Sequence, residues 1–353
     1  MSAAHDLAAR AFRAVDPESG HKLAVAAMAA GLGPRARSDK WPRLKTTLAG
    51  LSLPNPIGLA AGFDKDARCA DGMLGAGFGF VECGTVTPLP QPGNPKPRLF
   101  RLMEDRAAIN RMGFNNDGLE GFARRLAQRK QHGIVGANVG ANKESADRAA
   151  DYVIGMARVW PFASYITANI SSPNPPGLRG LQERGALEDL LGRIAEARGP
   201  LTAEHGARPV FLKVAPDLDE SAVADIVAVV LNAHLDGIIV SNTTIARPGS
   251  LASKYRSETG GLSGRPLFAP STEMLRLFAR AVAGRVALIG AGGIEGGGGA
   301  LAKIKAGANA VQLYTALVFE GPTLAAKIAR SLAARLEAEG FAHVADAVGA
   351  DLR

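Results

Sequence analysis

Short, almost continuous apolar runs recur along this chain of 353 residues from Leu53 onward, separated by longer stretches with helical periodicity. Strands buried on both faces of a parallel sheet have this appearance, whereas half-exposed strands alternate apolar and polar residues. The eight runs are residues 57–61, 80–85, 134–139, 165–170, 210–214, 237–241, 286–290 and 310–314. The clearest helical stretches between them are residues 187–197, 221–233, 272–283 and 299–306. Eight such β–α units in about 300 residues predict an α/β fold, a single (β/α)8 TIM barrel.

An open, doubly wound sheet is the alternative architecture. It needs a point at which the strand order reverses, and the pattern contains none. Two connections are long for a barrel, namely the proline-rich residues 88–97 and residues 246–265. We expect both to fold over the mouth of the barrel, because structureless loops of this length are otherwise uncommon in compact domains.

The first 45 residues follow a different pattern, which predicts a small extension of two amphipathic helices. The first is expected within residues 3–15 and the second from Lys22 to about Leu32, with residues 16–20 as a break before His21. The apolar face of the first helix carries Leu7, Ala11, Phe12 and Val15. The chain therefore divides into an extension, residues 1–45, and a barrel, residues 46–353.

The uncharged run of residues 23–34 is too short to cross a bilayer and is typical of a segment that lies at its surface. A signal peptide is the alternative, but Pro17 and three acidic residues make a poor start for one. We therefore interpret the extension as a cap that faces a membrane or controls access to the site. A simple helical lid on the barrel is the other possibility.

Charge favours the membrane interpretation. The net charge is +8, and half of this excess lies in residues 1–45, which hold eight Lys or Arg against four Asp or Glu. An anionic membrane surface is a natural partner for such a segment. Nucleic acid is not expected, since only 5% of the residues are aromatic and the remaining charge is mixed in sign. The two cysteines form no C-x-x-C pair and the six histidines no H-x-x-x-H pair, so neither a disulfide framework nor a metal is expected.

Small and polar residues follow each of the eight predicted strands, at the end where (β/α)8 barrels carry their chemistry. They are Ala60, Ala61, Gly62 and Lys65, then Thr85, Asn138, Asn169 with Ser172 and Asn174, Lys213, Ser241 with Asn242 and Thr243, Gly292 with Gly293, and Tyr314 with Thr315. The loop at residues 169–180 reads N-I-S-S-P-N-P-P-G-L-R-G, in which prolines and glycines prevent a helix. A ring of amides, hydroxyls and two lysines with no carboxylate at its centre predicts a pocket for a flat, polar, anionic ligand.

Two features of this ring indicate what the ligand contains. The glycine-rich turn at residues 290–294 and the pair Tyr314 and Thr315 follow strands seven and eight, where barrels bind phosphate through backbone N–H groups. Lys213 lies in an otherwise apolar strand and needs an anionic partner to offset its desolvation. A reduced flavin would supply that negative charge.

Seven longer motifs connect the chain to a known family: A-A-G-F-D-K, E-C-G-T-V-T-P, P-R-L-F-R-L, I-N-R-M-G-F-N-N, N-I-S-S-P-N, G-G-L-S-G-R-P-L and G-A-G-G-I. Through them nearly the whole chain resembles the dihydroorotate dehydrogenases, and specifically their class 2, quinone-dependent, membrane-associated branch. The resemblance implies an FMN-containing barrel that oxidises (S)-dihydroorotate to orotate in pyrimidine biosynthesis and reduces a membrane quinone. It also implies a monomer held peripherally at the cytoplasmic face of the bacterial inner membrane.

The resemblance also implies a role for each motif position. FMN contacts are implied for Ala60, Ala61, Gly62, Thr85, Asn138, Asn169, Lys213, Ser241, Gly264, Gly293, Tyr314 and Thr315. Dihydroorotate contacts are implied for Lys65, Asn110, Arg111, Met112, Gly113, Phe114, Asn169, Asn174, Asn242 and Thr243. Quinone-site positions are His21, Arg101 and Tyr314. Ser172 falls at the catalytic base, which takes the C5 proton while C6 is oxidised.

The chain departs from the family pattern at two positions. Pro175 stands where many class 2 members have a threonine that helps to relay the proton, and proline has neither a hydroxyl nor an N–H group. We expect an ordered water near Ser172 to take over the relay. Val318 stands where some members have threonine, so the polar contacts of the quinone site are expected to differ.

Two other functions compete with this interpretation. Dihydrouridine synthases are also FMN barrels, but they use a catalytic cysteine on an active-site loop, where this chain has Ser172. Cys69 and Cys83 are accordingly interpreted as buried packing residues. A non-catalytic, membrane-binding barrel is the other alternative, and the complete polar ring argues against it.

Overall fold

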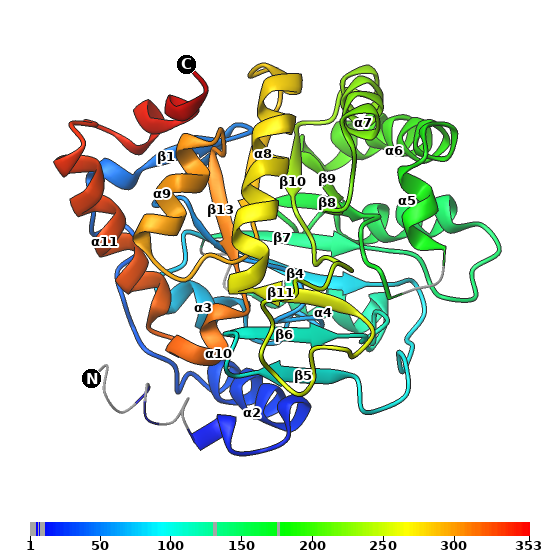
Figure 1. Cartoon of the computed structure of the whole chain (residues 1–353). Coiled ribbons are helices and arrows are strands. Elements are labelled where there is room, and N and C mark those ends of the chain that lie inside the picture. The colour runs from blue at the N-terminus through cyan, green and yellow to red at the C-terminus, as the bar shows by residue number, and fades with distance from the viewer. Residues whose placement is uncertain (1–4, 6, 8–10, 130–132, 175–176) are drawn as a thin grey trace.

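The computed structural model of the chain describes residues 5, 7, 11–129, 133–174 and 177–353, and it contains the predicted barrel (Figure 1). Eight parallel strands close in the order β10-β12-β13-β3-β4-β7-β8-β9. Their bounds are β3 (Ile57–Leu59), β4 (Phe80–Val86), β7 (Ile134–Val139), β8 (Tyr165–Asn169), β9 (Val210–Val214), β10 (Gly237–Val240), β12 (Ala287–Ala291) and β13 (Ala310–Leu313). The predicted (β/α)8 fold is therefore confirmed. Every strand lies within two residues of its apolar run, because burial on both faces leaves no room for polar alternation.

Helices surround the barrel on its outer side (Figure 1). They are α3 (Ala70–Gly75), α4 (Leu119–Ala127), α5 (Arg148–Val159), α6 (Arg184–His205), α7 (Glu220–Asn232), α8 (Phe268–Val282), α9 (Gly297–Lys305), α10 (Ala316–Glu320) and α11 (Leu324–Ala338). Short 3₁₀ turns are η1 (Pro42–Leu44), η2 (Leu178–Gln182), η3 (Arg265–Leu267), η4 (Val344–Ala347) and η5 (Ala350–Leu352). Helix α7 illustrates why these segments are helical. Asp219 caps its first turn by accepting the N–H of Ala222. Its buried face carries Val223, Ile226 and Val230 at helical spacing.

A hairpin that the sequence pattern did not predict closes the N-terminal end of the barrel. It consists of β1 (Thr46–Leu48) and β2 (Leu51–Leu53), which pair antiparallel. Leu48 and Leu53 are buried in one apolar cluster with Phe80, Tyr165 and Phe211, whose aromatic rings meet inside the barrel. This apolar floor leaves the C-terminal end of the strands for a ligand.

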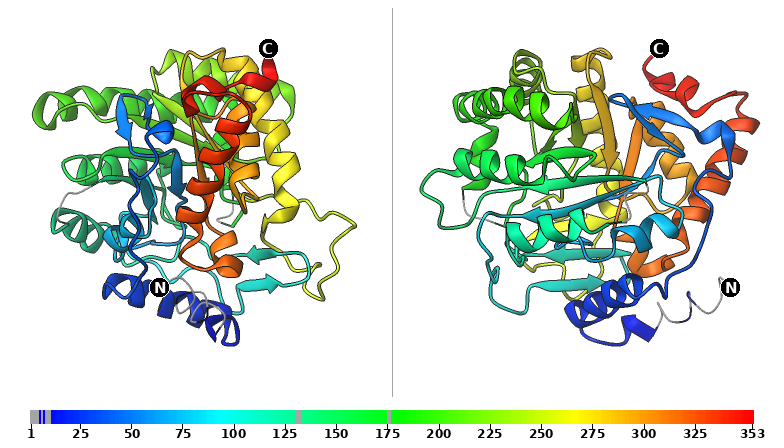
Figure 2. Two further views of the ribbon diagram at one scale, coloured as in Figure 1. Left: turned by 90° about the vertical axis from the view of Figure 1, so that its left-hand side faces the viewer. Right: turned by 180° about the vertical axis from the view of Figure 1, so that it is seen from behind.

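A separate sheet lies at that C-terminal end, built from the segment that follows the proline-rich connection and from the connection of residues 246–265. Its strands are β5 (Leu99–Leu102), β6 (Ala107–Asn110) and β11 (Gly261–Gly264), in the antiparallel order β11-β6-β5. Figure 2 shows from two further sides that this sheet lies between the barrel and helix α2 (Pro17–Ala29). Strand β11 falls inside the predicted loop of residues 246–265. Its G-L-S-G sequence carries little strand signal, so only pairing with β6 makes it a strand.

Helix α2 corrects the prediction for the extension. It begins at Pro17 and ends at Ala29, so residues 16–20 are its start and not a break. The side chain of Asp16 accepts the N–H of Ser19 at 2.9 Å and caps the first turn, and Pro17 occupies the first helical position, where its missing N–H costs nothing. A proline next to an N-cap residue therefore marks a helix start here.

The remaining predictions for the extension are only partly within the described residues. Residues 5, 7 and 11–13 are helical, and the rest of the predicted first helix up to residue 10, like Pro175 and the relay proposed for it, lies outside the part of the chain that the structure describes. No helix among the described residues is long and apolar enough to span a membrane. The division at residue 45 stays a prediction.

A buried ion pair fastens α2 to the sheet β11-β6-β5, called the covering sheet below. Arg98, which precedes β5, donates from two guanidinium nitrogens to the two carboxylate oxygens of Glu18, at 2.8 and 3.1 Å. Both side chains are less than a tenth exposed. The hydrogen bonds and charge of Arg98 lower the pKa of Glu18, against the opposing effect of burial. Arg98 also donates to the carbonyl groups of Pro92 and Asn94, so the same guanidinium holds the proline-rich loop.

We predict that Glu18→Gln loosens α2 selectively, because it leaves the buried charge of Arg98 without a carboxylate. Breaking a buried pair in this way costs about 3 kcal/mol or more, so amide hydrogen exchange within α2 should accelerate on the order of a hundredfold. Glu188→Gln, which removes an exposed ion pair with Arg184, is the control and should leave exchange unchanged. Unaltered exchange of α2 in Glu18→Gln would contradict the anchoring role. Because the folded pKa of Glu18 is lowered, this stabilisation should also disappear as the pH falls below the ordinary glutamate range.

Candidate active site

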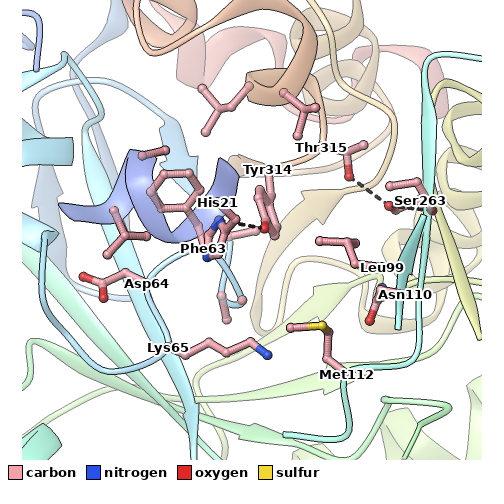
Figure 3. A pocket seen from close by; sticks show the side chains of 18 of the residues that line it. His21, Phe63, Asp64, Lys65, Leu99, Asn110, Met112, Ser263, Tyr314 and Thr315 are labelled. Atoms are coloured by element: carbon pink, nitrogen blue, oxygen red, sulfur yellow. Dashed lines mark hydrogen bonds between the residues drawn. The ribbon is translucent and has the colours of Figure 1, made fainter. Parts of the chain in front are cut away.

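One cavity of about 1380 Å³ lies at the C-terminal ends of the barrel strands and continues as far as α2 (Figure 3). It brings together most of the residues proposed from the sequence, although they come from distant parts of the chain. The predicted residues that line it are His21, Ala60, Ala61, Gly62, Lys65, Thr85, Arg101, Asn110, Met112, Gly113, Phe114, Asn169, Ser172, Asn174, Lys213, Ser241, Asn242, Thr243, Gly264, Gly293, Tyr314 and Thr315.

Two predicted contact residues do not line this cavity. The guanidinium of Arg111 pairs with Glu258 at 2.7 Å and stacks on the ring of Phe100, which holds the covering sheet together. Asn138 is fully buried one layer below the cavity wall. Its amide oxygen accepts from the hydroxyl of Thr85 at 2.6 Å, so its position is that of a support for a lining residue.

Ser172 lies in the loop after β8 and is 6% exposed. Its Oγ accepts the backbone N–H of Asn174 at 3.4 Å, and the amide of Asn174 donates to Asn110 Oδ1 at 3.0 Å. Asn110 is the last residue of β6 in the covering sheet. A loop of the barrel and a strand of the sheet thus present a hydroxyl and two amides to the same part of the cavity.

A chain of hydrogen bonds sets the orientation of the amide of Asn169. Its Nδ2 donates to the hydroxyl of Thr85 at 2.8 Å, and that hydroxyl donates to Asn138. Its Oδ1 accepts from the hydroxyl of Ser171 at 2.8 Å, and Asn242 donates to the same hydroxyl at 3.0 Å. The amides on this side of the cavity therefore have defined directions, which a ligand with amide edges requires.

Glu82 corrects the expectation that no carboxylate lies at the centre of the ring. It belongs to β4, is fully buried, and its Oε1 lies 4.0 Å from Nζ of Lys213. Four further side chains donate to this carboxylate: Asn138 at 2.8 Å, Gln312 at 2.9 Å, and Tyr165 and Thr167 at 3.1 Å. The anionic partner that Lys213 needs is thus already part of the protein, and no ligand is required to supply it.

The pKa values of the two lysines of the cavity are lowered by burial and are affected differently by neighbouring charges. Burial lowers the pKa of Lys213, and the carboxylate of Glu82 opposes this effect. Burial, helped by the charge of Arg98, lowers the pKa of Lys65 to about 8. The ammonium of Lys65 donates to Asn115 Oδ1 and has no carboxylate within 4.0 Å among the described residues. An anionic ligand beside Lys65 would restore its full charge.

Glycines at the end of β11 and after β12 line the cavity where the chain leaves no room for a side chain. Gly293 has φ of 72°, and a Cβ placed on it would lie 2.6 Å from backbone atoms of Phe268 at the start of α8. Gly264 has φ of 93°, so it too adopts a conformation that favours glycine. The hydroxyl of Thr315 donates to Ser263 beside them at 2.9 Å (Figure 3). Backbone N–H groups near a helix N-terminus form the kind of site that binds phosphate.

The other end of the cavity reaches α2 and is largely aromatic. The ring of His21 contacts Phe63 edge-on, and its Nδ1 lies 3.3 Å from the hydroxyl of Tyr314 (Figure 3). Burial, aided by the charge of Lys65, lowers the pKa of His21 to about 4, so the imidazole is neutral at pH 7. Arg101 donates to the carbonyl groups of residues 12, 13 and 15 and thereby ends the first helical segment.

The two cysteines are buried, as predicted. Cys83 Sγ lies 3.6 Å from a carboxylate oxygen of Asp64, and burial together with this carboxylate raises the pKa of both thiols well above the ordinary value. Neither thiol is suited to act as a nucleophile or base. Among the described residues, no group of three or more His, Cys, Asp or Glu side chains could hold a metal ion.

Comparison with known proteins identifies the family. Residues 43–336 match the family model described as dihydroorotate dehydrogenase. The chain belongs to the dihydroorotate dehydrogenase family. It is 54% identical over 347 residues to the dihydroorotate dehydrogenase (quinone) of Xanthobacter autotrophicus, with 97% of each chain covered. It is 56% identical over 352 residues to that of Sphingopyxis alaskensis, covering 99% of this chain and 97% of the relative. The crystal structure of the Eimeria tenella enzyme in complex with ferulenol matches with a TM-score of 0.91, at 41% identity and 96% coverage of each chain.

These relatives confirm the predicted family, the predicted barrel and the predicted enzyme class, a quinone-dependent dihydroorotate dehydrogenase. Such an enzyme oxidises dihydroorotate in pyrimidine biosynthesis and passes the electrons to a quinone. The roles of the individual residues in this dihydroorotate dehydrogenase stay predictions. The structure adds that Val318, a departure from the family pattern, also lines the cavity.

The buried carboxylate of Glu82 is the main feature of the dihydroorotate dehydrogenase site that the sequence reading missed. A signal was present, since Glu82 interrupts an apolar strand in the same way as Lys213 does. Gln312 was also missed; it lines the cavity, and its Oε1 has no hydrogen-bond partner among the described residues. An orphaned buried oxygen facing a cavity indicates a donor on a ligand or a water.

We predict that Tyr165→Phe destabilises the protein by about 1.5–3 kcal/mol, because it removes a hydrogen bond to a buried carboxylate and changes little else. Tyr152→Phe is the matched control: its hydroxyl is equally buried and donates at 2.7 Å to a neutral carbonyl, that of Asn169. That substitution should cost about 0.5–1.5 kcal/mol. Chemical denaturation of both variants measures the difference. An equal or smaller loss for Tyr165→Phe would argue against Glu82 as a charged acceptor.

Proposed function

We propose that this dihydroorotate dehydrogenase uses FMN as its redox cofactor, with Ser172 as the base that takes the C5 proton of dihydroorotate. The observation that carries the proposal is the juxtaposition, in one cavity, of Ser172, the lysines Lys65 and Lys213, and the glycine-rich phosphate cradle around Gly293. These groups match three parts of the chemistry: a proton acceptor, anion recognition and a phosphate ester.

The residues present fit an FMN molecule. Gly264 and Gly293 both line the cavity and pack so closely against neighbouring backbone that no side chain fits there, which leaves their peptide groups as the wall that a phosphate would meet. Lys213 and Oε1 of Gln312, which has no hydrogen-bond partner among the described residues, offer polar contacts for a flavin ring. Asn169 and Thr85 present further polar atoms on the same wall. A bound FMN would accept the electron pair that leaves C6 of dihydroorotate and pass it on to the quinone.

The substrate side of the cavity would be formed by asparagine amides and Lys65. Orotate is planar, with amide edges and one carboxylate, so amides of Asn110, Asn174 and Asn242 can pair with the edges while Lys65 meets the charge. Phe114, itself 7% exposed, lies in the same wall and would help to exclude water from Ser172. Exclusion of water strengthens each of these electrostatic contacts.

The electron acceptor would enter along α2. The aromatic end of the cavity, with neutral His21 and Tyr314, connects the barrel mouth to the inner side of this helix. On its outer side Leu23 is half exposed, and Leu32 and Val15 nearby are also exposed. We place this face on an anionic membrane surface at the cytoplasmic side of the bacterial inner membrane, with the enzyme acting as a monomer.

Anaerobic stopped-flow measurement of the flavin tests the catalytic assignment. Dihydroorotate should bleach the FMN of the wild-type protein, and Ser172→Ala should slow this step by roughly 10²–10⁴-fold, the usual contribution of a positioned base. Reoxidation by quinone should change little, because it does not use the C5 proton. Ser171→Ala is the matched control from the next position; its hydroxyl bonds to Asn169, so a loss below about tenfold is expected.

Three outcomes would count against this assignment. Purified protein that contains FAD or no flavin would exclude FMN as the cofactor. Equal slowing of reduction and reoxidation in Ser172→Ala, or a larger effect in Ser171→Ala, would exclude Ser172 as the base.

Membrane association has its own test. Leu23→Asp should weaken binding to vesicles that contain an anionic lipid by at least about tenfold, because it removes an apolar anchor worth ~1.5–3 kcal/mol and adds a repelled charge. Ile154→Asp on α5 is the control, since Ile154 is also 50% exposed but lies on another helix. Similar vesicle binding by both variants, measured by co-sedimentation, would refute the assignment of the α2 face.

A further inference from the structure

Lys303 is a fully buried lysine that none of the proposed catalytic steps uses. It lies near the end of α9, and its Nζ donates to the hydroxyl of Ser271 on α8 at 2.6 Å. Among the described residues no carboxylate lies within 4.0 Å of it, and its nearest ring is that of Phe268, at 5.3 Å. A desolvated ammonium without a counter-charge is costly, so its presence calls for an anion nearby.

The surroundings of Lys303 point to the phosphate cradle as the place of that anion. A Cβ on Gly290 in β12 would lie 3.3 Å from the Cβ of Lys303, so the lysine stem packs directly against the strand that leads into the cradle. Ser271 in turn lies against the cradle: its hydroxyl donates most closely to the carbonyl of Leu267, at 2.6 Å, and its Oγ also lies 3.3 Å from the carbonyl oxygen of Gly292. Lys303 and Ser271 therefore stand directly behind the loop of Gly292 and Gly293.

This arrangement also influences where the loop directs its N–H group. The carbonyl of Gly292 and the N–H of Gly293 belong to one peptide unit, and in a trans peptide they point in opposite directions. The carbonyl of Gly292 faces Ser271, which leaves the N–H of Gly293 on the opposite side, and both glycines line the cavity. Other cations near the cradle, Arg106 and Arg265, are already paired with Glu295.

We propose that Lys303 is a positioning residue for the phosphate of FMN, which holds the Gly292–Gly293 loop through Ser271 and supplies the uncompensated positive charge behind it. This inference rests on the proposed use of FMN. Burial, helped by the charge of Arg276, lowers the pKa of Lys303 to about 7, as expected for an ammonium that still lacks its counter-ion. A phosphate in the cradle would favour the charged form.

Comparison of FMN with riboflavin, which lacks the phosphate, isolates this role. Dissociation constants of the two flavins are obtained from free-flavin fluorescence on dilution of the holoprotein and by exchange with added riboflavin. Lys303→Gln can still donate to Ser271 but carries no charge, and it should raise the FMN dissociation constant by about 10- to 100-fold. The riboflavin constant should change less than about twofold. Lys303→Arg, which keeps the charge, should recover most of the FMN affinity.

Lys305→Met is the control on the same helix, because Lys305 is only partly buried and pairs with Glu339 and Asp351. It should leave both constants unchanged. Lys303→Met, which also removes the hydrogen bond, should lose FMN affinity at least as strongly as Lys303→Gln; if it does not fold, Lys303→Gln decides alone. Equal weakening of FMN and riboflavin, or no weakening of either, overturns the role of Lys303 and leaves the cofactor assignment intact. A wild-type protein that binds no FMN overturns both.

Discussion

The buried carboxylate of Glu82 is the interaction on which the arrangement of the site depends. It lies inside the barrel and receives hydrogen bonds or charge from side chains on four other strands, β7, β8, β9 and β13. Below it the interior is closed by aromatic rings and the β1–β2 hairpin, and above it the cavity begins. Because an unpaired buried charge is so costly, these strands have to keep the relative positions that satisfy it. The orientation of Asn138, and through it of Thr85 and Asn169, follows from this requirement.

A similar principle operates twice more around the cavity. The pair of Glu18 and Arg98 ties α2 to the covering sheet, so the proposed entrance for the quinone is held by a buried charge pair. Lys303 lies behind the proposed phosphate cradle and has no carboxylate within 4.0 Å in the part of the chain that the structure describes. Glu82, the Glu18–Arg98 pair and Lys303 thus place buried charge at three different parts of the cavity wall or its support.

The sequence by itself determined the fold class and most of the site. The eight apolar runs predicted the strands because a barrel strand is buried on both faces, and this requirement is local. The polar residues at the strand ends could be grouped into one site without coordinates, since all parallel strands deliver their carboxyl ends to the same rim. Lys65, Ser172 and Lys213 were found in this way, and the family resemblance added His21 and Arg101.

Only the tertiary structure decided which groups become partners. Lys213 was recognised as needing an anion, but a pattern of residues cannot reveal that the anion is Glu82, because the two are brought together by the closure of the barrel. Strand β11 depends on pairing with β6, a segment about 150 residues away in the chain, so local propensity could not predict it. Arg111 shows the same limit: its motif suggested a contact with the substrate, and the fold turns its guanidinium toward Glu258. Local pattern encodes burial and periodicity, whereas the identity of a buried charge's partner is a property of the folded chain.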